Sequence, residues 1–257
     1  MDFRKTGSRQ GIATELTSLR WLAEAAGGAP TAEITGQGED WLTTRRMSHG
    51  QPTAAQAAEF GRALARTHAA GAAHWGAPPP GLPESAARLA ELPAPVSAEP
   101  RWGSWGEFYA EARLRPYLQR ATIPAEAARP LNRAIDLIAE QHFDAPQPSL
   151  VGGVARIHGD LWGGNVVWDT SAGHARGTLI DPSAHGGHAE TDLAELALFG
   201  VPRLAAIRAG YQEVSPLADG WADRVGLHQF HMLLVHAALF GGGYVSQAIG
   251  CANRLLR

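Results

Sequence analysis

Residues 156–182 read RIHGDLWGGNVVWDTSAGHARGTLIDP, and this stretch decides the fold. Short apolar and β-branched runs alternate in it with clusters of glycine, aspartate and asparagine, a pattern typical of strands joined by turns. Glycines in the first loop allow backbone angles that other residues resist. We therefore predict a strand that ends at His158, a polar loop, and a β-hairpin with strands near residues 166–168 and 178–180.

Three side chains with oxygen donors lie at the ends of these predicted elements. Asp160 is followed by Asn165 five positions later and by Asp181 after 21 positions. The first interval equals that of the protein-kinase loop H-R-D-x-x-x-x-N, in which the aspartate orients the attacking hydroxyl and the asparagine holds Mg²⁺. Mg²⁺ prefers such oxygen ligands together with substrate phosphates. The spacing predicts phosphoryl transfer, with Asp160 as the base and Asn165 and Asp181 as metal ligands.

Each of these residues also has an ordinary structural explanation. Asp160 and Asn165 could be turn formers, and Asp181 could simply end a strand, because aspartate, asparagine and glycine dominate turns. The occurrence of all three around one hairpin favours the metal site over three independent turn residues.

Two segments resemble the fructosamine kinase family, also called ketosamine kinases, which is part of the wider aminoglycoside-phosphotransferase-like group of small-molecule kinases. They are HGDLWGGNVVW at residues 158–168 and LIDPSAHGGHAETDLAELALFG at residues 179–200. The wider group shares the H-G-D…N and I-D signatures. The Leu-Trp after the first aspartate and the H-x-E-x-D-L-A after the second are similar to this family in particular. The resemblance is dense from about Trp41 to the C-terminus.

This resemblance implies an α+β, protein-kinase-like fold of two lobes, with a reduced N-terminal β lobe and a mainly helical C-terminal lobe. It also implies ATP and Mg²⁺ as cofactors. We expect the N-terminal lobe and hinge, on the nucleotide side, at residues 1–48, and the helical lobe with the catalytic hairpin at residues 49–257. Within the latter, Thr53 and Gln56 form a capping-box pattern that predicts a helix start. Residues 76–100, rich in proline, glycine and alanine, read as a loop or lid.

The family resemblance assigns phosphate binding to Lys5 and the ion pair that fixes this lysine to Glu15. In kinases, a strand lysine holds the α- and β-phosphates and pairs with a helix glutamate. Residues 14–25 read as a helix whose apolar stripe includes Glu15, so that this carboxylate would point inward. The alternative is a solvated terminal lysine and an exposed carboxylate favoured by the helix dipole.

The start of the sequence departs from the family pattern. A kinase N-terminal lobe normally opens with two strands and a glycine-rich turn that covers the phosphates, yet only four residues precede Lys5. The segment Gly36-Gln37-Gly38 is no substitute, because the third glycine is missing and no helix start follows. Either the start of the chain is cut short, or the lobe is reduced and holds ATP less firmly.

Composition and charge exclude several classes of protein. With 257 residues, 45% of them hydrophobic, the chain is long enough to bury a sizeable core. The net charge of −3 and the scattered arginines give no support for nucleic-acid binding, which needs clustered basic residues. The single cysteine, Cys251, rules out an internal disulfide and reads as a small apolar core residue.

Targeting signals are not expected in this sequence. The N-terminal MDFRKTGSRQ carries charges where a signal peptide needs an apolar run. The apolar stretch at residues 232–244 is too short to span a bilayer and is interrupted by His236. We therefore expect a cytoplasmic protein without a membrane partner, and the oligomeric state is open.

Several further residues are weaker candidates for the site. Trp162 next to the base could stack on a substrate or pack under the loop, and His185 and His188 are weak candidates for acceptor contacts. With Glu190, the two histidines resemble metal ligands by type, but the spacing of a zinc motif such as H-E-x-x-H is absent. His68 reads as a satisfied core histidine.

The family resemblance also implies a supporting role for two residues. Asp192 should begin a helix, and its carboxylate would turn back to brace the loop at His158 and Gly159. Gly159 itself bears on the substrate class. Glycine cannot make the charge-assisted contact to a phosphorylated activation loop that arginine makes at this position in protein kinases, and no A-P-E element follows Asp181.

The acceptor is therefore expected to be a small molecule. The resemblance implies the sugar hydroxyl of a ketosamine, a glycated amine, in a deglycation repair pathway. Two alternatives stay open at this point. One is another small-molecule kinase of the wider group, with an aminoglycoside or choline as acceptor. The other is a pseudokinase binding protein without turnover.

Overall fold

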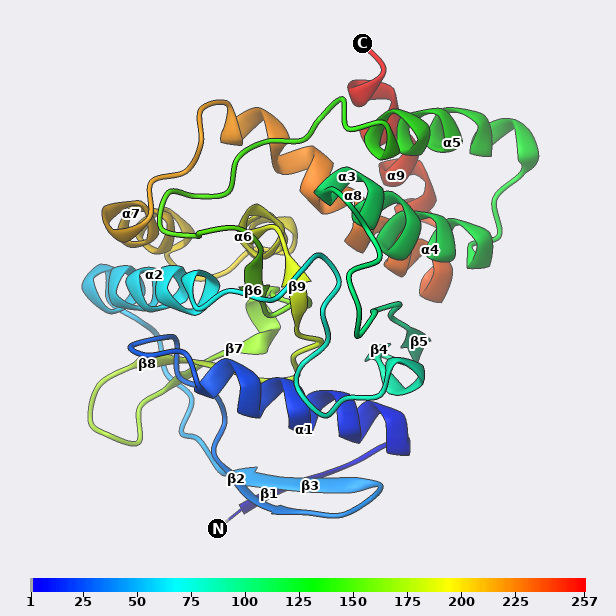
Figure 1. Ribbon diagram of the computed structural model, residues 1–257. Helices are drawn as coiled ribbons and strands as arrows, with labels where there is room; N and C mark the ends of the chain where they lie inside the picture. Colours follow the sequence, from blue (N-terminus) through cyan, green and yellow to red (C-terminus); the bar gives the residue numbers. More distant parts are fainter. Residues whose placement is uncertain (1) are drawn as a thin grey trace.

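An antiparallel sheet of three strands, in the order β1-β3-β2, forms the N-terminal part of the structure, a computed structural model that describes residues 2–257 (Figure 1). The central strand β3 (Trp41–Arg45) pairs with β1 (Asp2–Thr6) on one side and with β2 (Ile34–Gln37) on the other. Lys5 lies opposite Leu42 in this register. The alternation of buried and half-exposed residues along β3 shows that one face of the sheet is covered.

Helix α1 (Arg9–Ala23) lies against this sheet and begins earlier than the predicted residue 14. The Ser8 side chain accepts a hydrogen bond from the Gly11 N–H and so caps the helix one turn further toward the N-terminus. The buried face includes Leu19, Leu22 and Glu15, which confirms the inward orientation of that carboxylate.

The larger part of the structure is helical. Helix α2 (Ala54–Ala69) starts with the predicted capping box. It packs closely on α7 (Leu204–Val214) because a glycine on each helix faces the backbone of the other. A Cβ at Gly61 would lie 2.0 Å from the Ile207 carbonyl oxygen, and one at Gly210 would lie 2.0 Å from that of Ala58. The predicted fold class, α+β with a mainly helical C-terminal part, is confirmed.

A second group of helices builds a separate core. One continuous helical run comprises α3 (Trp105–Phe108), the π-helical segment η2 (Tyr109–Leu114) and α4 (Arg115–Arg120). Pro116 does not end this run. The proline has no N–H to donate, and the Ala112 carbonyl accepts from the Arg113 guanidinium. The partners of the run are α5 (Ala125–Ala139) and α8 (Trp221–Phe240), and α9 (Gly243–Leu255) packs on these two helices.

Short antiparallel strand pairs lie between the two parts. The predicted hairpin is present as β7 (Val166–Asp169) and β8 (Arg176–Leu179), with Val166 opposite Leu179. The short 3-10 helix η3 (Gly163–Asn165) leads into β7. The strand before the loop is β6 (Ala155–Ile157), which pairs with β9 (His185–Gly187), and α6 (Ala189–Leu198) follows.

The stretch at residues 76–100 is more ordered than a simple loop. It contains the 3-10 turn η1 (Glu84–Ala86) and a small hairpin of β4 (Arg88–Leu89) and β5 (Leu92–Pro93). Thr14 of α1 accepts from the Arg88 N–H and donates to the Ala86 carbonyl, which ties the hairpin to the helix.

The hydrophobic core does not stop at the predicted lobe boundary. One cluster joins Trp21 and Leu22 of α1 to Phe60 of α2 and Leu179 of β8. The division at residue 48 therefore stays a prediction. Among residues 2–257, no helix is both long enough and apolar enough to cross a membrane.

Candidate active site

The loop after β6 carries Asp160, and the protein holds this loop by its backbone N–H groups. One Asp192 oxygen accepts from the His158 N–H at 2.7 Å, and the other accepts from the Gly159 N–H at 3.0 Å. The N–H of Asp160 itself donates to His158 Nδ1 at 3.2 Å. The contact between Asp192 and this loop, which the family resemblance implied, is therefore present. The helix α6 that carries Asp192 begins three residues earlier than predicted.

Glu195, one turn further along α6, completes this hold on the loop. It is fully buried, and one of its oxygens accepts from the Leu161 N–H at 2.8 Å. Burial, together with the charges of Asp192 and Asp160, raises the pKa of Glu195 well above its ordinary value. Sequence reasoning missed this residue, because an acidic residue on a helix is usually solvated. Four consecutive backbone donors, at residues 158–161, thus have partners inside the protein.

His158 connects the loop to the strand end that carries Asp181. Its Nδ1 accepts from Asp160, so its Nε2 carries the proton and donates to the Ile180 carbonyl at 2.9 Å. Burial lowers the pKa of His158, which favours this neutral form. One imidazole therefore fixes the spacing between the two backbone segments on which Asp160 and Asp181 lie.

Asp192 is also supported by a buried, hydrogen-bonded pair of side chains, His68 and Tyr211. The Tyr211 hydroxyl contacts His68 Nδ1 at 2.9 Å, and His68 Nε2 contacts Asp192 at 3.0 Å. Because the carboxylate can only accept, His68 donates to it and accepts from the tyrosine. Burial alone would raise the pKa of Asp192, but the hydrogen bond from His68 and the N–H donors hold this pKa below its ordinary value. His68 is the satisfied core histidine that the sequence predicted.

Lys5 lies between two carboxylates. Its Nζ is 2.8 Å from Glu15 Oε2 and 2.7 Å from Asp181 Oδ1, so the alternative of a solvated terminal lysine does not hold. Burial and the charge of Asp181 raise the pKa of Glu15 to about 7, although Lys5 opposes this. Burial would also raise the pKa of Asp181, but the bond to Lys5 holds it below its ordinary value. The single ammonium therefore lies within ion-pair distance of both carboxylates.

Asp160 and Asn165 are in direct contact. The Asn165 side-chain N–H₂ donates to the Asp160 carbonyl at 2.8 Å and to Asp160 Oδ2 at 3.1 Å. Burial raises the pKa of Asp160 to about 7, against the effect of the Asn165 hydrogen bond. Because the amide nitrogen of Asn165 is committed to Asp160, its amide oxygen is the atom that a cation could use.

These residues share a cavity of about 320 Å³. Its lining includes Lys5, Asp160, Asn165 and Asp181. Residues 88–91, around the β4–β5 turn, also line it. Ser183 donates to the Arg88 carbonyl at 2.7 Å and so anchors this hairpin to the segment after Asp181.

A second cavity of about 500 Å³ adjoins the first and shares three residues with it, Lys5, Glu15 and Asp181. Its remaining lining is mostly apolar and includes Leu42, Val167 and Ile180, together with the segment at residues 45–47 that leaves β3. The charged residues therefore lie at the junction of an apolar cavity and a polar one.

His185 and His188 do not lie where an acceptor contact requires. His185 is buried below Gly159, where it contacts the Ser183 carbonyl at 2.9 Å and Arg113 Nε at 3.3 Å. His188 is buried as the N-terminal cap of α6. Their expected role in acceptor binding is thus corrected to a structural one, because residue type alone does not reveal burial in the core.

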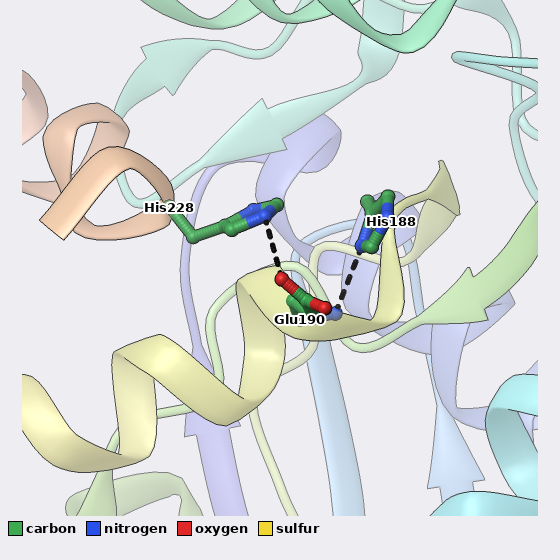
Figure 2. Close-up of side chains that lie close together, drawn as sticks. All are labelled: His188, Glu190 and His228. Carbon is green, nitrogen blue, oxygen red and sulfur yellow. Dashed lines mark hydrogen bonds and ion pairs between the residues drawn. The ribbon is translucent and has the colours of Figure 1, made fainter. Parts of the chain in front are cut away.

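His188 is also part of a buried cluster with Glu190 and His228, drawn in Figure 2. These residues are of the types that bind metal ions, but their ligand atoms have partners within the protein. Arg224 donates to both Glu190 oxygens, at 2.9 and 2.6 Å, and so occupies the carboxylate with a cation. His188 Nδ1 accepts from the Glu190 N–H, and Thr191 contacts His228 Nδ1 at 2.9 Å. The cluster reads as a structural ion pair.

Replacing Glu190 with glutamine is expected to lower the free energy of unfolding at neutral pH by about 2 kcal/mol, because Arg224 loses a charged partner. Burial alone would raise the pKa of Glu190, but hydrogen bonds from His228 and Arg224 hold it at about 2, below its ordinary value of 4.5. The carboxylate therefore contributes its full stabilisation above pH 4.5, and this contribution is lost as the pH falls from 4.5 toward about 2.

Urea unfolding of wild type and variant, at neutral pH and at about pH 3, measures this effect. The difference between the two proteins should shrink at the lower pH. Glu213→Gln serves as the control, since its pair with Arg62 is exposed and is expected to contribute less than about 1 kcal/mol. An equal loss for Glu190→Gln at both pH values would contradict the prediction.

Trp162 is 40% exposed and lines the 320 Å³ cavity. Its ring meets that of Phe199 edge-on at 6.1 Å. Trp162 is therefore a cavity wall with one face in solvent, which agrees with either of the roles that the sequence left open.

The chain is similar in sequence to known proteins. A family profile described as fructosamine kinase matches residues 3–257. A probable ketoamine kinase of Synechocystis is 35% identical over 159 residues, which is 60% of this chain and 49% of that protein. The chain thus spans about half the length of this curated relative.

Solved structures extend the comparison. A fructosamine-3-kinase homologue from Thermobifida fusca is 38% identical, with a TM-score of 0.85 over 100% of this chain and 85% of that one. A choline/ethanolamine kinase family protein from Mesorhizobium loti is 15% identical, with a TM-score of 0.55 over 99% and 81% of the two chains, and shares the fold.

Proposed function

The chain belongs to the fructosamine kinase family, and from this membership we propose that it transfers the γ-phosphoryl group of ATP to a sugar hydroxyl of a ketosamine, the adduct of a sugar with an amine. One observation carries the proposal. A half-buried aspartate, an asparagine, a second aspartate and a lysine line a single polar cavity that joins an apolar cavity of about 500 Å³. Phosphoryl transfer needs this combination of groups in one place.

We infer that the apolar cavity takes the adenine ring. Its size suits a nucleotide base, and its mostly apolar lining with a backbone segment at one side is typical of such sites. The segment at residues 45–47 would supply backbone hydrogen bonds to the ring edge. The phosphates would then point to the junction of the two cavities, where Lys5 lies.

Two residues that line the polar cavity, Asn165 and Asp181, fit a magnesium ion by the chemistry of their donors. Asn165 offers an amide oxygen and Asp181 a carboxylate, both of which are hard oxygen ligands of the kind that Mg²⁺ prefers. Bound there, Mg²⁺ would neutralise phosphate charge and orient the leaving group. Lys5 would bind the non-transferred phosphates, and Glu15, only 2.8 Å from Lys5 Nζ, would keep the ammonium in position.

Asp160 acts on the acceptor in the proposed mechanism. Its carboxylate accepts the proton of the sugar hydroxyl as that oxygen forms a bond to the γ-phosphorus. The bond from phosphorus to the bridging oxygen breaks, and ADP leaves. Because little covalent chemistry falls to the protein in such a transfer, positioning dominates catalysis. The backbone hold on residues 158–161 supports this role for Asp160.

An assay of ADP release tests the substrate class. The purified protein is incubated with Mg-ATP and either ketosamines of the fructosamine and ribulosamine type, aminoglycosides, or choline. We expect turnover with the ketosamines, and phosphorylation at a sugar hydroxyl can be verified by ³¹P NMR. Turnover only with an aminoglycoside or choline would overturn the proposed acceptor, and no turnover with any of them would overturn the proposed activity. A role in deglycation and a cytoplasmic site of action belong to the same proposal.

Mg-ATP at about one hundred times its dissociation constant is expected to raise the free energy of unfolding by roughly 2.7 kcal/mol. With Asp181→Asn, the magnesium-dependent part of this stabilisation should be lost, because a carboxylate ligand becomes a neutral amide. Thermal unfolding with ATP, with and without Mg²⁺, measures both effects.

Asp169→Asn is the matched control for this variant. Asp169 lies on the same hairpin, and its carboxylate caps the turn by accepting from the Ser48 and Ser171 N–H groups. The control should keep the full response to Mg²⁺. An unchanged response in Asp181→Asn would remove Asp181 from the metal site.

A further inference from the structure

A row of aromatic rings runs from the polar cavity onto the protein surface. We define this aromatic strip by five residues in contact order, Trp162, Phe199, His236, Phe240 and Tyr244. The Trp162 and Phe199 rings meet at 6.1 Å, and those of Phe199 and His236 at 4.9 Å. The His236 ring lies 5.6 Å from Phe240 and 4.9 Å from Tyr244. The row is therefore continuous from the cavity wall to the surface.

The strip is exposed beyond the cavity. Phe199 is 40% exposed and Phe240 is 68% exposed. These residues come from the C-terminal ends of α6 and α8, while Tyr244 lies at the start of α9 (Figure 1). Exposed aromatic rings that form a contiguous patch mark binding surfaces more often than rings exposed singly.

Close backbone packing holds the cavity end of the strip in place. A Cβ at Gly163 would lie 2.2 Å from the Gly200 carbonyl oxygen, so the loop after Trp162 packs directly on the segment after Phe199. The far end is open, because a Cβ at Gly241 or Gly242 would meet nothing within 4 Å. The backbone between Phe240 and Tyr244 therefore borders open space.

The chemistry of the strip suits a chain that is partly apolar and positively charged. Aromatic faces bind aliphatic groups by dispersion and cations through the ring quadrupole. The strip carries no formal charge when His236 is neutral. Burial lowers the pKa of His236, and its Nδ1 lies 2.9 Å from the Met232 carbonyl.

We propose that the aromatic strip binds the amine portion of the acceptor, namely the aliphatic chain and flanking residues of a glycated lysine in a peptide. The inference rests on the proposed function, in which the sugar lies at Asp160. A ketosamine carries its amine substituent beyond the sugar, and the strip begins at Trp162, a wall of the cavity that would take the sugar. The amine of such an adduct is a secondary ammonium, which is a suitable partner for an aromatic face.

The test compares two acceptors that differ only beyond the sugar. One is the fructosyl adduct of methylamine, and the other is a short peptide with one fructosyl-lysine between neutral residues. For Phe240→Ala and Tyr244→Ala, we expect kcat/KM for the peptide to fall roughly three- to tenfold. The value for the methylamine adduct should stay within about twofold, because this small acceptor does not reach the strip.

Two controls separate the strip from a general loss of folding. Phe240→Tyr keeps an aromatic face and should retain wild-type preference for the peptide. Leu150→Ala removes an apolar side chain that is 47% exposed and lies outside the strip, and it should leave kcat/KM for both acceptors unchanged. Variants are compared only at matched thermal stability.

The outcomes separate this inference from the proposed function. Turnover of both acceptors with an unchanged ratio in Phe240→Ala and Tyr244→Ala would overturn the role of the strip alone. No turnover of either acceptor by the wild type would overturn the proposed function and this inference with it. Concentration-dependent dimerisation that Phe240→Ala abolishes, without a change in the substrate ratio, would assign the strip to a second copy of the chain instead.

Discussion

Asp160→Asn is expected to lower kcat for ketosamine phosphorylation by about 100- to 10,000-fold, the range that loss of a general base produces. The amide that replaces the carboxylate cannot accept the proton of the acceptor hydroxyl. The substitution keeps the shape of the side chain, and the amide oxygen can still accept the hydrogen bond that Asn165 donates to Asp160 Oδ2 at 3.1 Å. The loop should therefore keep its conformation.

Nucleotide binding separates a chemical effect from a structural one. Lys5, Glu15 and Asp181 are untouched in this variant, so the stabilisation by Mg-ATP should equal that of the wild type. Steady-state ADP release and thermal unfolding with Mg-ATP measure the two properties. Asp169→Asn, on the following hairpin, is again the control and should retain activity. If Asp160→Asn kept more than about a tenth of wild-type kcat, the base assignment would be wrong.

The local geometry around Asp160 could be predicted from the sequence because it depends on residues close together in the chain. The turn residues of the loop and the two apolar runs of the hairpin predicted β7 and β8, and the structure adds their register, with Val166 opposite Leu179. The five-residue interval that brings Asn165 to Asp160 is part of the same local segment. The family resemblance added Lys5 and Glu15, whose contact links strand β1 to helix α1.

The surroundings of the site depend on contacts between distant parts of the chain. Glu195 binds the Leu161 N–H across 34 positions, and Thr14 anchors the β4–β5 hairpin at Arg88 across 74 positions. Neither contact has a periodicity or a motif that would reveal it. Glu195 in particular reads as a surface residue, because carboxylates are rarely fully buried without a partner.

Histidines were the main source of error. His185 and His188 were weak candidates for acceptor contacts, but strand β9 and the start of α6 turn both side chains into the core. The residue types suggested a binding role, but nothing in the sequence pattern indicates whether these two side chains face the cavity or the core. His68 was predicted correctly because it lies on the apolar face of a helix, where a histidine is usually satisfied by buried partners.

Asp192→Ala is expected to lower the free energy of unfolding by about 3–5 kcal/mol, a large share of the stability of a typical domain. Asp192 is fully buried and accepts hydrogen bonds from His68 and from the N–H groups of His158 and Gly159. Alanine would leave three buried donors without a partner, and each carries a desolvation cost of about 1–3 kcal/mol. The lower limit of about 3 kcal/mol allows for water that enters the space left by the carboxylate and binds some of these donors.

The same substitution should also reduce kcat, because the loop that holds Asp160 loses two of its four backbone anchors. Urea unfolding and ADP release, measured on the same preparations, test both effects. Asp136→Ala is the control, since Asp136 pairs with Arg115 at an exposed position and is expected to contribute less than about 1 kcal/mol. Asp192→Asn should fall between wild type and alanine, because its amide keeps one acceptor oxygen for the loop but turns a donor toward another N–H. A stability of Asp192→Ala within 1 kcal/mol of the wild type would mean that His158 and Gly159 find other acceptors. The rigidity of the loop could then not be ascribed to α6.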